Sequence, residues 1–362
     1  MGLTAEHDAL WRGMRVLVTG HTGFKGAWLT LWLHRLGADV AGYSLAPKPG
    51  PNAFDLARLD EIGGAEFADI RDRNSLDAAF DRHRPQIVFH LAAQALVREG
   101  YADPAATYEI NALGTANVLL AARAHKSVRA VVAVTSDKCY DASASDRRHR
   151  EDDPLGGDDP YSASKACAEH VAAALRATWS SVQQTGHMRI ATARAGNVIG
   201  GGDWAADRLV PDALAAFTAG KSLSIRNPSA VRPWQYMLDP IRAYIDLARR
   251  LVAENGLEFA RPWNFGPSES AERTVSWVAD RLASAWGEGA AWQAQAGNHP
   301  PERHTLRLDS AAAASALGWR TRVELERALE LTIRWYRACR DGTPARALML
   351  DEIERYEKAC AV

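Results

Sequence analysis

Short apolar runs alternate with stretches of helical spacing along the first half of the chain. The runs predict buried strands at residues 14–19, 39–44, 86–91, 128–135 and 189–195, and the periodic stretches predict helices at 27–36, 74–82, 106–124 and 160–179. Asp159 is expected to cap the last of these helices, with Pro160 at its first position. This alternation predicts an α/β fold, a doubly wound Rossmann-type parallel sheet that binds ligands beyond the carboxyl ends of its strands.

The second half of the chain is less regular. Three consecutive glycines at 200–202 mark a loop, and helices are expected at 239–253, 274–286 and 324–339. A chain of 362 residues exceeds the size at which one core keeps growing, so we expect two lobes. We place a nucleotide-binding domain at residues 1–192, with a return segment at about 236–266, and a smaller mixed substrate lobe at 193–362.

Composition narrows the classes of protein to consider. The formal net charge is −1, and the one dense basic run, Arg147 to Arg150, is followed at once by acidic residues, which favours a solvated loop over a nucleic-acid surface. No apolar run approaches membrane-spanning length, and the four cysteines lack C-x-x-C spacing. The histidines lack zinc-site spacing. We therefore expect a cytoplasmic protein that binds no nucleic acid, no membrane and no metal.

A glycine-rich turn joins the first predicted strand to the first predicted helix. Gly20, Gly23 and Gly26 form a G-x-x-G-x-x-G pattern, in which glycines allow a tight turn, close approach of a pyrophosphate and helix packing on the sheet. A plain glycine turn is the alternative. The second strand ends at Ser44 without the usual acidic residue, so the residues leave NAD and NADP undecided. Asp69 could bind an adenine amine or cap a helix.

Tyr161 and Lys165 are four residues apart, on one face of a predicted helix. A nearby ammonium favours the phenolate form of tyrosine and lowers its pKa, so this pair could take a proton from an alcohol while hydride leaves the same carbon. Such spacing also arises by chance on helix surfaces. Ser136 follows a predicted strand, where its hydroxyl could bind the reacting oxygen.

Several motifs in order complete the pattern: VTGHTGFKG, HLAAQALV, YEINALGT, TSDKCY, YSASK, RAGNVIGGGDWA, RPWQYMLDP and WNFGP. Together they resemble the extended short-chain dehydrogenase/reductase family and, within it, the CDP-glucose 4,6-dehydratase branch. The resemblance implies NAD as cofactor and a nucleotide-diphosphate sugar, CDP-glucose, as substrate. The expected cofactor contacts are Gly20, Thr22, Gly23, Phe24, Lys25, Gly26, Ser44, Asp69, Ile70, Leu91, Ala92, Ala93, Gln94, Asn111, Tyr161 and Lys165.

Asp137 and Lys138 directly follow Ser136 and favour dehydration over simple oxidation. Loss of water across C5 and C6 needs a base for the C5 proton and an acid for the C6 hydroxyl, and we assign these roles to Lys138 and Asp137. Related dehydratases have glutamate at the second position. A lysine serves as a base only when its pKa falls well below its usual value, so pairing of Lys138 with Asp137 or a phosphate is the alternative.

The second lobe is expected to bind the nucleotide diphosphate, with arginine forks on the phosphates. Trp204 and Trp234 are expected in loops, where they could stack on sugar or base. The expected substrate contacts are Gln94, Arg98, Asn197, Trp204, Arg208, Arg232, Trp234, Tyr236, Arg303 and His304.

Three interpretations of the function are open from the sequence. The leading one is a lyase that removes water through an internal NAD redox cycle. A 4-epimerase or another nucleotide-sugar dehydratase on the same fold is the second, and a non-catalytic nucleotide sensor is the third. By analogy with the family, a homodimer is expected through the helices predicted at 106–124 and 160–179.

Overall fold

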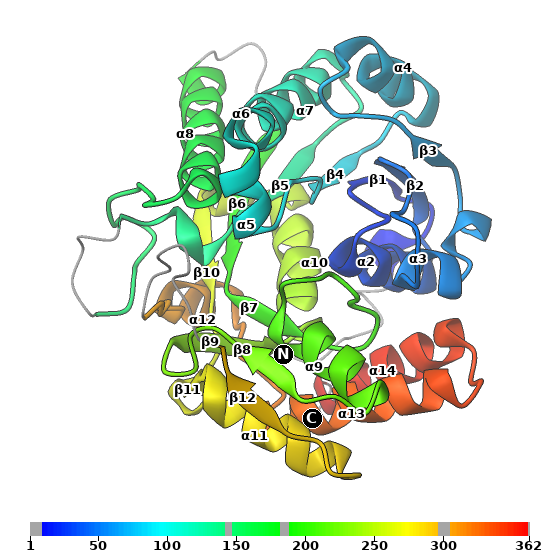
Figure 1. The fold of residues 1–362 in the computed structure, drawn as a ribbon. Helices are drawn as coiled ribbons and strands as arrows, with labels where there is room; N and C mark the ends of the chain where they lie inside the picture. Colours follow the sequence, from blue (N-terminus) through cyan, green and yellow to red (C-terminus); the bar gives the residue numbers. More distant parts are fainter. Residues whose placement is uncertain (1–8, 142–146, 182–187, 296–304, 361–362) are drawn as a thin grey trace.

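A computed structural model describes residues 9–141, 147–181, 188–295 and 305–360. Its largest sheet, within the described residues, has seven strands in the order β10-β6-β5-β4-β1-β2-β3 (Figure 1). All neighbouring strands of this sheet are parallel. The Rossmann-type fold predicted from the alternation is therefore confirmed. The strands are β1 (Arg15–Thr19), β2 (Asp39–Ser44), β3 (Ala65–Phe67), β4 (Ile87–His90), β5 (Ala130–Val134), β6 (Arg189–Ala195) and β10 (Pro262–Phe265).

Helices cover both faces of this sheet, because successive strand residues point to opposite sides. Val16 and Val18 of β1 belong to the core shared with α2 (Phe24–Arg35) and α10 (Leu238–Val252). Leu17 between them belongs to the core under the other layer of helices. That layer consists of α4 (Arg73–His83), α7 (Gly114–Ala124) and α8 (Pro160–Ser181), as Figure 1 shows.

The helix predicted at 106–124 is interrupted. It consists of α6 (Pro104–Tyr108), a π-helical turn η2 (Glu109–Leu113) and α7. A π turn is a wide turn often found at functional sites. It presents Asn111, whose side-chain amide donates to the Gln94 carbonyl at 3.0 Å and to Ser164 Oγ at 2.8 Å. The turn therefore joins the segment after β4 to helix α8.

The rest of the chain forms a second, smaller layer of mixed structure. Its three-stranded sheet has the order β11-β9-β7, with β9 parallel to β7 and antiparallel to β11, and β8 pairs with β12. These strands are β7 (Asn197–Ile199), β8 (Leu223–Ile225), β9 (Val231–Tyr236), β11 (Glu272–Thr274) and β12 (Trp292–Ala294). Helices here are α9 (Leu209–Thr218), α11 (Val275–Trp286), α12 (Ala311–Leu317), α13 (Leu325–Arg340) and α14 (Ala345–Cys360).

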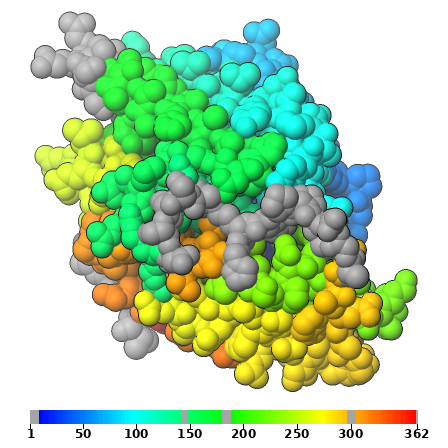
Figure 2. Space-filling view, turned by 60° about the vertical axis from the view of Figure 1, so that its left-hand side comes forward, coloured from blue at the N-terminus to red at the C-terminus, as the bar shows by residue number. Residues whose placement is uncertain are grey.

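The last helix returns to the first one. Trp32 of α2 packs edge-on against Tyr356 of α14 with ring centroids 5.6 Å apart, and its indole donates to Glu357 at 2.8 Å. In Figure 2, α8 in green and the segment around α5 (Val97–Ala102) and α6 in cyan occupy the upper half of the visible face. The yellow α11 region occupies the lower half.

Most predicted elements are present, with bounds within a few residues. Asp159 caps α8, since its carboxylate accepts from Ser162 N at 2.9 Å. The prediction that Trp234 lies in a loop is wrong, because it lies on β9. Among the described residues, no helix is long and apolar enough to cross a membrane.

Candidate active site

The carboxyl end of β5 brings the predicted reactive groups together. Ser136 follows this strand and caps a short 3₁₀ turn, η3 (Asp137–Cys139). Its hydroxyl accepts from Lys138 N at 3.2 Å and donates to Asp137 Oδ1 at 3.0 Å. The phenol of Tyr161, from the first turn of α8, hydrogen-bonds to the same hydroxyl. Hydroxyl, phenol and carboxyl therefore meet at one strand end.

Tyr161 and Lys165 are both buried, and burial decides their acidity. Burial raises the pKa of Tyr161 to about 12, opposed by its hydrogen bond to Ser136 and reinforced by the charge of Asp137. The lowered tyrosine pKa expected from the sequence is therefore wrong in this structure. Burial, assisted by the positive charge of Lys25, lowers the pKa of Lys165 to about 8. Positive charge near the phenol, such as that of the Lys165 ammonium, opposes the effect of burial and favours the phenolate form.

Asp137 is a buried carboxyl with one uncommitted oxygen. Burial raises its pKa, and the charges and hydrogen bonds of Lys138, Ser136, Arg232 and Lys25 oppose that shift. Its Oδ2 has no hydrogen-bond partner among the described residues. A carboxyl with a raised pKa and one oxygen without a hydrogen-bond partner suits a general acid.

Two glycines of the loop leave no room for a side chain, and the third is less crowded. Gly20 has φ +77°, and a Cβ there would lie 2.6 Å from Ala92 N. A Cβ on Gly26 would lie 2.0 Å from the Gly20 carbonyl oxygen. At Gly23 the nearest atom is that same oxygen, at 3.3 Å. Gly23, at the N-terminus of α2, is thus where a phosphate can approach the backbone.

Positive charge gathers beside this loop. Lys25 is half-buried, and its pKa is lowered to about 8 by desolvation and by the charge of Arg208, while the charges of Asp137 and Asp203 oppose the shift. Lys25 in turn lowers the pKa of Lys165. Neighbouring ammonium groups that repel one another favour the binding of an anionic ligand, such as the pyrophosphate of a dinucleotide. The residues present therefore fit NAD.

The ribose and adenine side of the loop is built from hydroxyls. Ser44 Oγ lies 2.9 Å from Thr22 Oγ1 and 3.1 Å from His21 Nδ1. Asp69 is held by the guanidinium of Arg71 at 2.7 Å, which lowers the pKa of its carboxyl. Ile70 packs where a Cβ on Gly114 would lie. No carboxylate from the end of β2 is present to bind a ribose, as the sequence indicated.

The segment after β4 contributes mainly backbone. Leu91 N donates to the Thr19 carbonyl at 3.0 Å, and Ala92 N donates to Thr19 Oγ1 at 3.3 Å. Ala93 follows in the same half-buried stretch. Gln94 is committed to the protein, since its side-chain amide donates to Thr107 Oγ1 at 3.0 Å. Its predicted contacts with cofactor and substrate stay predictions.

Three predicted substrate arginines lie around the same region. Arg98 of α5 pairs with Asp207 at 2.7 Å, and Arg208 pairs with Asp203 at 2.8 Å. The positive charge of Arg232 lowers the pKa of Asp137 and so opposes the effect of burial. Asn197 begins β7, close in sequence to Gly196, whose Cβ would lie 3.2 Å from Asp137 Oδ2.

The aromatic residues predicted to contact the substrate pack against, or hydrogen-bond to, other parts of the protein. Trp234 donates its indole N–H to the Arg273 carbonyl at 3.0 Å, and the buried Tyr236 hydroxyl bonds to Glu352. Trp204 packs edge-on against Trp335 and Tyr336. Arg303 and His304 lie outside the described residues. Phe24 is half-buried at the start of α2.

Two buried charged residues beside the site were not predicted from the sequence. Glu169 and Arg194 form an ion pair at 2.8 Å, with both side chains 2 % exposed. Glu169 follows Lys165 by four residues, so the spacing that links Tyr161 to Lys165 could have identified it. Among the described residues, no group of three or more His, Cys, Asp or Glu side chains could hold a metal ion.

Comparison with known proteins agrees with this geometry. The model of the NAD dependent epimerase/dehydratase family matches residues 16–259, and the chain belongs to this family. It is 44% identical over 352 residues to a CDP-glucose 4,6-dehydratase from Salmonella typhimurium, covering 96% of this chain and 98% of that one. The expected NAD-dependent class of enzyme is thus confirmed.

Solved structures of other members share the fold. DesIV, a dTDP-glucose 4,6-dehydratase from Streptomyces venezuelae solved with NAD bound, is 26% identical, with a TM-score of 0.75. The alignment covers 91% of this chain and 98% of that one. A UDP-glucose 4-epimerase of Thermus thermophilus in complex with NAD is also 26% identical, with a TM-score of 0.73 and coverage of 90% and 99%.

Proposed function

We propose that this protein is a CDP-glucose 4,6-dehydratase, a hydro-lyase that converts CDP-glucose to CDP-4-keto-6-deoxyglucose and water in deoxysugar biosynthesis. The observation that carries the proposal is the buried carboxyl of Asp137 beside Lys138, adjoining the Ser136–Tyr161 contact. The 44% identical CDP-glucose 4,6-dehydratase of Salmonella typhimurium supports the choice of substrate.

Each reactive side chain has one part in the reaction. NAD held by the glycine loop around Gly23 would supply the hydride acceptor for oxidation at C4 and the hydride for reduction at C6. Tyr161 takes the proton of the 4-hydroxyl, and Ser136 donates a hydrogen bond to that oxygen. Lys165 supplies positive charge that favours the phenolate. The 4-keto group acidifies C5, Lys138 takes the C5 proton, and Asp137 donates its proton to the C6 oxygen as water leaves. Lys138 then returns the proton to C5 when hydride adds at C6, which gives the 4-keto-6-deoxy product.

The substrate assay separates the candidate functions. Purified protein is incubated with CDP-glucose, and the product is examined by its alkaline ultraviolet absorbance and by mass spectrometry for loss of water. We expect a 4-keto-6-deoxy product with CDP-glucose and much slower turnover with dTDP-glucose or UDP-glucose. A changed sugar of unchanged mass would assign an epimerase instead, and binding without turnover would assign a sensor.

We further propose a homodimer located in the cytoplasm. Leu113 and Leu120 are 62% and 41% exposed and lie seven residues apart, on one face of the η2–α7 segment. Exposed apolar side chains that share a helix face favour association with a second copy. NAD and nucleotide sugars are cytoplasmic metabolites, which supports the location. Sedimentation tests the interface: the wild-type protein is expected to be a dimer and Leu113→Glu a monomer.

A further inference from the structure

One buried ion pair, Glu169–Arg194, contacts the residues on either side of the predicted reactive segment. Glu169 stands on α8, and Arg194 stands near the end of β6. Burial alone would raise the pKa of Glu169, but the charge and hydrogen bonds of Arg194 outweigh it and keep the pKa below its ordinary value. The pair is therefore ionised inside the protein, where an uncompensated charge would be costly.

Glu169 connects helix α8 to the carboxyl end of β5 and to the middle of β6. Its Oε1 accepts from Thr135 Oγ1 at 2.5 Å, and its Oε2 accepts from Thr192 Oγ1 at 2.8 Å. Thr135 immediately precedes Ser136. The helix that presents Tyr161 and Lys165 is thus bonded directly to the residue next to the reactive hydroxyl.

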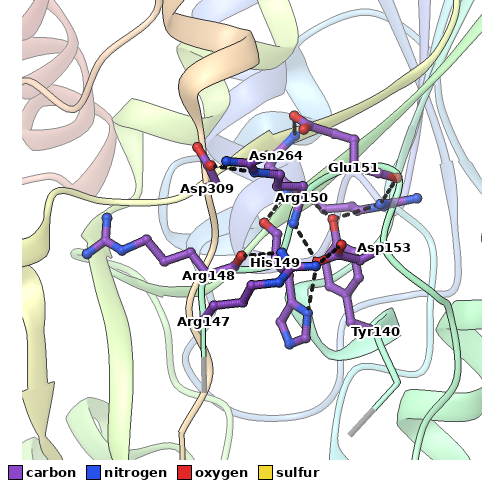
Figure 3. Close-up of polar contacts among 10 residues, drawn as sticks. Tyr140, Arg147, Arg148, His149, Arg150, Glu151, Asp153, Asn264 and Asp309 are labelled. Atoms are coloured by element: carbon purple, nitrogen blue, oxygen red, sulfur yellow. Dashed lines mark hydrogen bonds and ion pairs between the residues drawn. The ribbon is translucent and has the colours of Figure 1, made fainter. Parts of the chain in front are cut away.

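Arg194 holds the other end of the same reactive segment. Its Nη1 donates to the Tyr140 hydroxyl at 2.7 Å and to the Glu151 carbonyl at 3.0 Å. Tyr140 follows η3, and its hydroxyl donates to Asn264 Oδ1 at 2.6 Å. Figure 3 shows Tyr140, Asn264 and Glu151 close together, with their polar contacts as dashed lines. The segment from Ser136 to Cys139 is therefore fixed at both ends by partners of one ion pair.

We infer that Glu169 and Arg194 are positioning residues for the dehydration, setting the separation of the Tyr161 phenol from Ser136, Asp137 and Lys138. The inference rests on the proposed function. A displacement of reacting groups by about 1 Å can lower a rate by about 100-fold. The pair touches neither phenol nor hydroxyl and acts through Thr135 and Tyr140.

The same pair affects Lys165. Four charged or titratable groups face this ammonium. Lys25 from α2 lowers the pKa of Lys165, while Cys139 from η3 and Glu169 from α8 raise it. His90 of β4 is the fourth, and its own pKa is lowered by burial and by the charge of Lys165. Removing the Glu169 carboxylate therefore destabilises the ammonium form. A merely structural role of Glu169 would not move the pH at which Lys165 loses its proton.

The test uses isosteric variants of the full-length protein with CDP-glucose. Thr135→Val removes one hydroxyl at constant shape and is expected to lower kcat about 10-fold with KM within about 2-fold. Thr135→Ser keeps the hydroxyl and should retain activity. Glu169→Gln is expected to lower kcat by about 100-fold and to shift the alkaline limb of the pH profile to lower pH.

Asp246→Asn is the matched control. It breaks a partly buried ion pair with Arg242, at 2.7 Å within α10, and should leave kcat and the pH profile unchanged. Circular dichroism confirms folding of each variant. Folded Glu169→Gln and Thr135→Val with wild-type kcat and an unshifted alkaline limb would overturn the inference.

A second measurement separates this inference from the proposed function. If the wild-type protein turns over no CDP-glucose, the proposed function fails. Crystal structures of wild type and Glu169→Gln then decide the positioning role by the distance from the Tyr161 hydroxyl to Ser136 Oγ. An increase supports the inference, and an unchanged distance overturns it.

Discussion

Arg98 Nη1 lies 2.7 Å from Asp207 Oδ1, and this contact joins helix α5 to the loop before α9. Asp207 also accepts from Arg226 at 3.1 Å, and its backbone has a left-handed φ of +63°. Left-handed backbone in a residue other than glycine is uncommon and often marks a functional loop. The loop is thereby held next to Arg208, a predicted substrate contact.

The first prediction tests whether Arg98 binds the substrate through its guanidinium or matters only through its ion pair with Asp207. If Arg98 binds the diphosphate, Arg98→Ala should raise KM for CDP-glucose about 10-fold, the loss of about 1.4 kcal/mol of binding. Asp207→Asn removes the charge of the same ion pair, keeps a side chain that tolerates the left-handed backbone of this position and leaves the guanidinium of Arg98, so its KM should stay within about 2-fold of wild type. Steady-state kinetics check both. Equal KM increases would show that the ion pair, and not the arginine, matters.

The second prediction compares two glycines of one loop. A Cβ at Gly26 would collide with the Gly20 carbonyl at 2.0 Å, so Gly26→Ala should cost at least about 3 kcal/mol or prevent folding. Gly23→Ala meets a 3.3 Å contact that a small shift of the Gly20 carbonyl relieves, so its melting temperature should fall far less than that of Gly26→Ala. Its methyl group would stand in the path of the pyrophosphate, so Kd for NAD should rise about 10-fold. Thermal denaturation and NAD titration decide, and unchanged NAD binding by Gly23→Ala would contradict the placement.

The sequence predicts most about the candidate site where the residues involved are close together in the chain. The glycine loop and the Tyr161–Lys165 pair each lie within one strand–turn–helix unit or one helix face, so spacing alone places them. The site also depends on contacts between distant segments. Arg98 and Asp207 are 109 residues apart in sequence, and no local pattern joins them.

The second lobe was harder to predict for a physical reason. Strand β9 is buried along almost all its length, so it lacks the alternation of apolar and polar residues that identifies a half-buried strand. The sequence around Trp234 therefore resembles that of a loop. The acidity of Tyr161 was mispredicted because spacing reveals a neighbouring ammonium but not the depth of burial.

The third prediction concerns the acid. Asp137→Asn removes the transferable proton while keeping the shape of the side chain, so kcat should fall by about 100-fold or more. Oxidation at C4 does not use Asp137, so reduced nicotinamide should accumulate in a single turnover while water loss stops. Stopped-flow absorbance follows the first event, and mass spectrometry of quenched samples follows the second. Water loss at the wild-type rate would remove Asp137 from the acid role.

The fourth prediction concerns pH and the C-terminal helix. Burial raises the pKa of Glu352 to about 7, opposed by the hydroxyl of Tyr236 and the charge of Arg334. The folded protein therefore holds a proton that the unfolded chain, in which a glutamate has its ordinary pKa of 4.5, releases. Because the folded pKa is the higher one, the stabilisation is complete below about pH 4.5 and is lost as pH rises through about 7. A shift of this size corresponds to about 3 kcal/mol.

Glu352→Gln isolates that contribution, because the amide imitates the protonated carboxyl at every pH. The variant should be more stable than wild type at pH 8 and similar to it at pH 4, in denaturant or thermal unfolding. Asp239, whose pKa burial also raises to about 7, is present in both proteins, so its effect cancels in the comparison. Glu354→Gln, on the exposed side of the same helix, is the control and should follow wild type. If Glu352→Gln and wild type lose stability in parallel between pH 4 and 8, the carboxyl of Glu352 is ionised in the folded protein and the raised pKa is wrong.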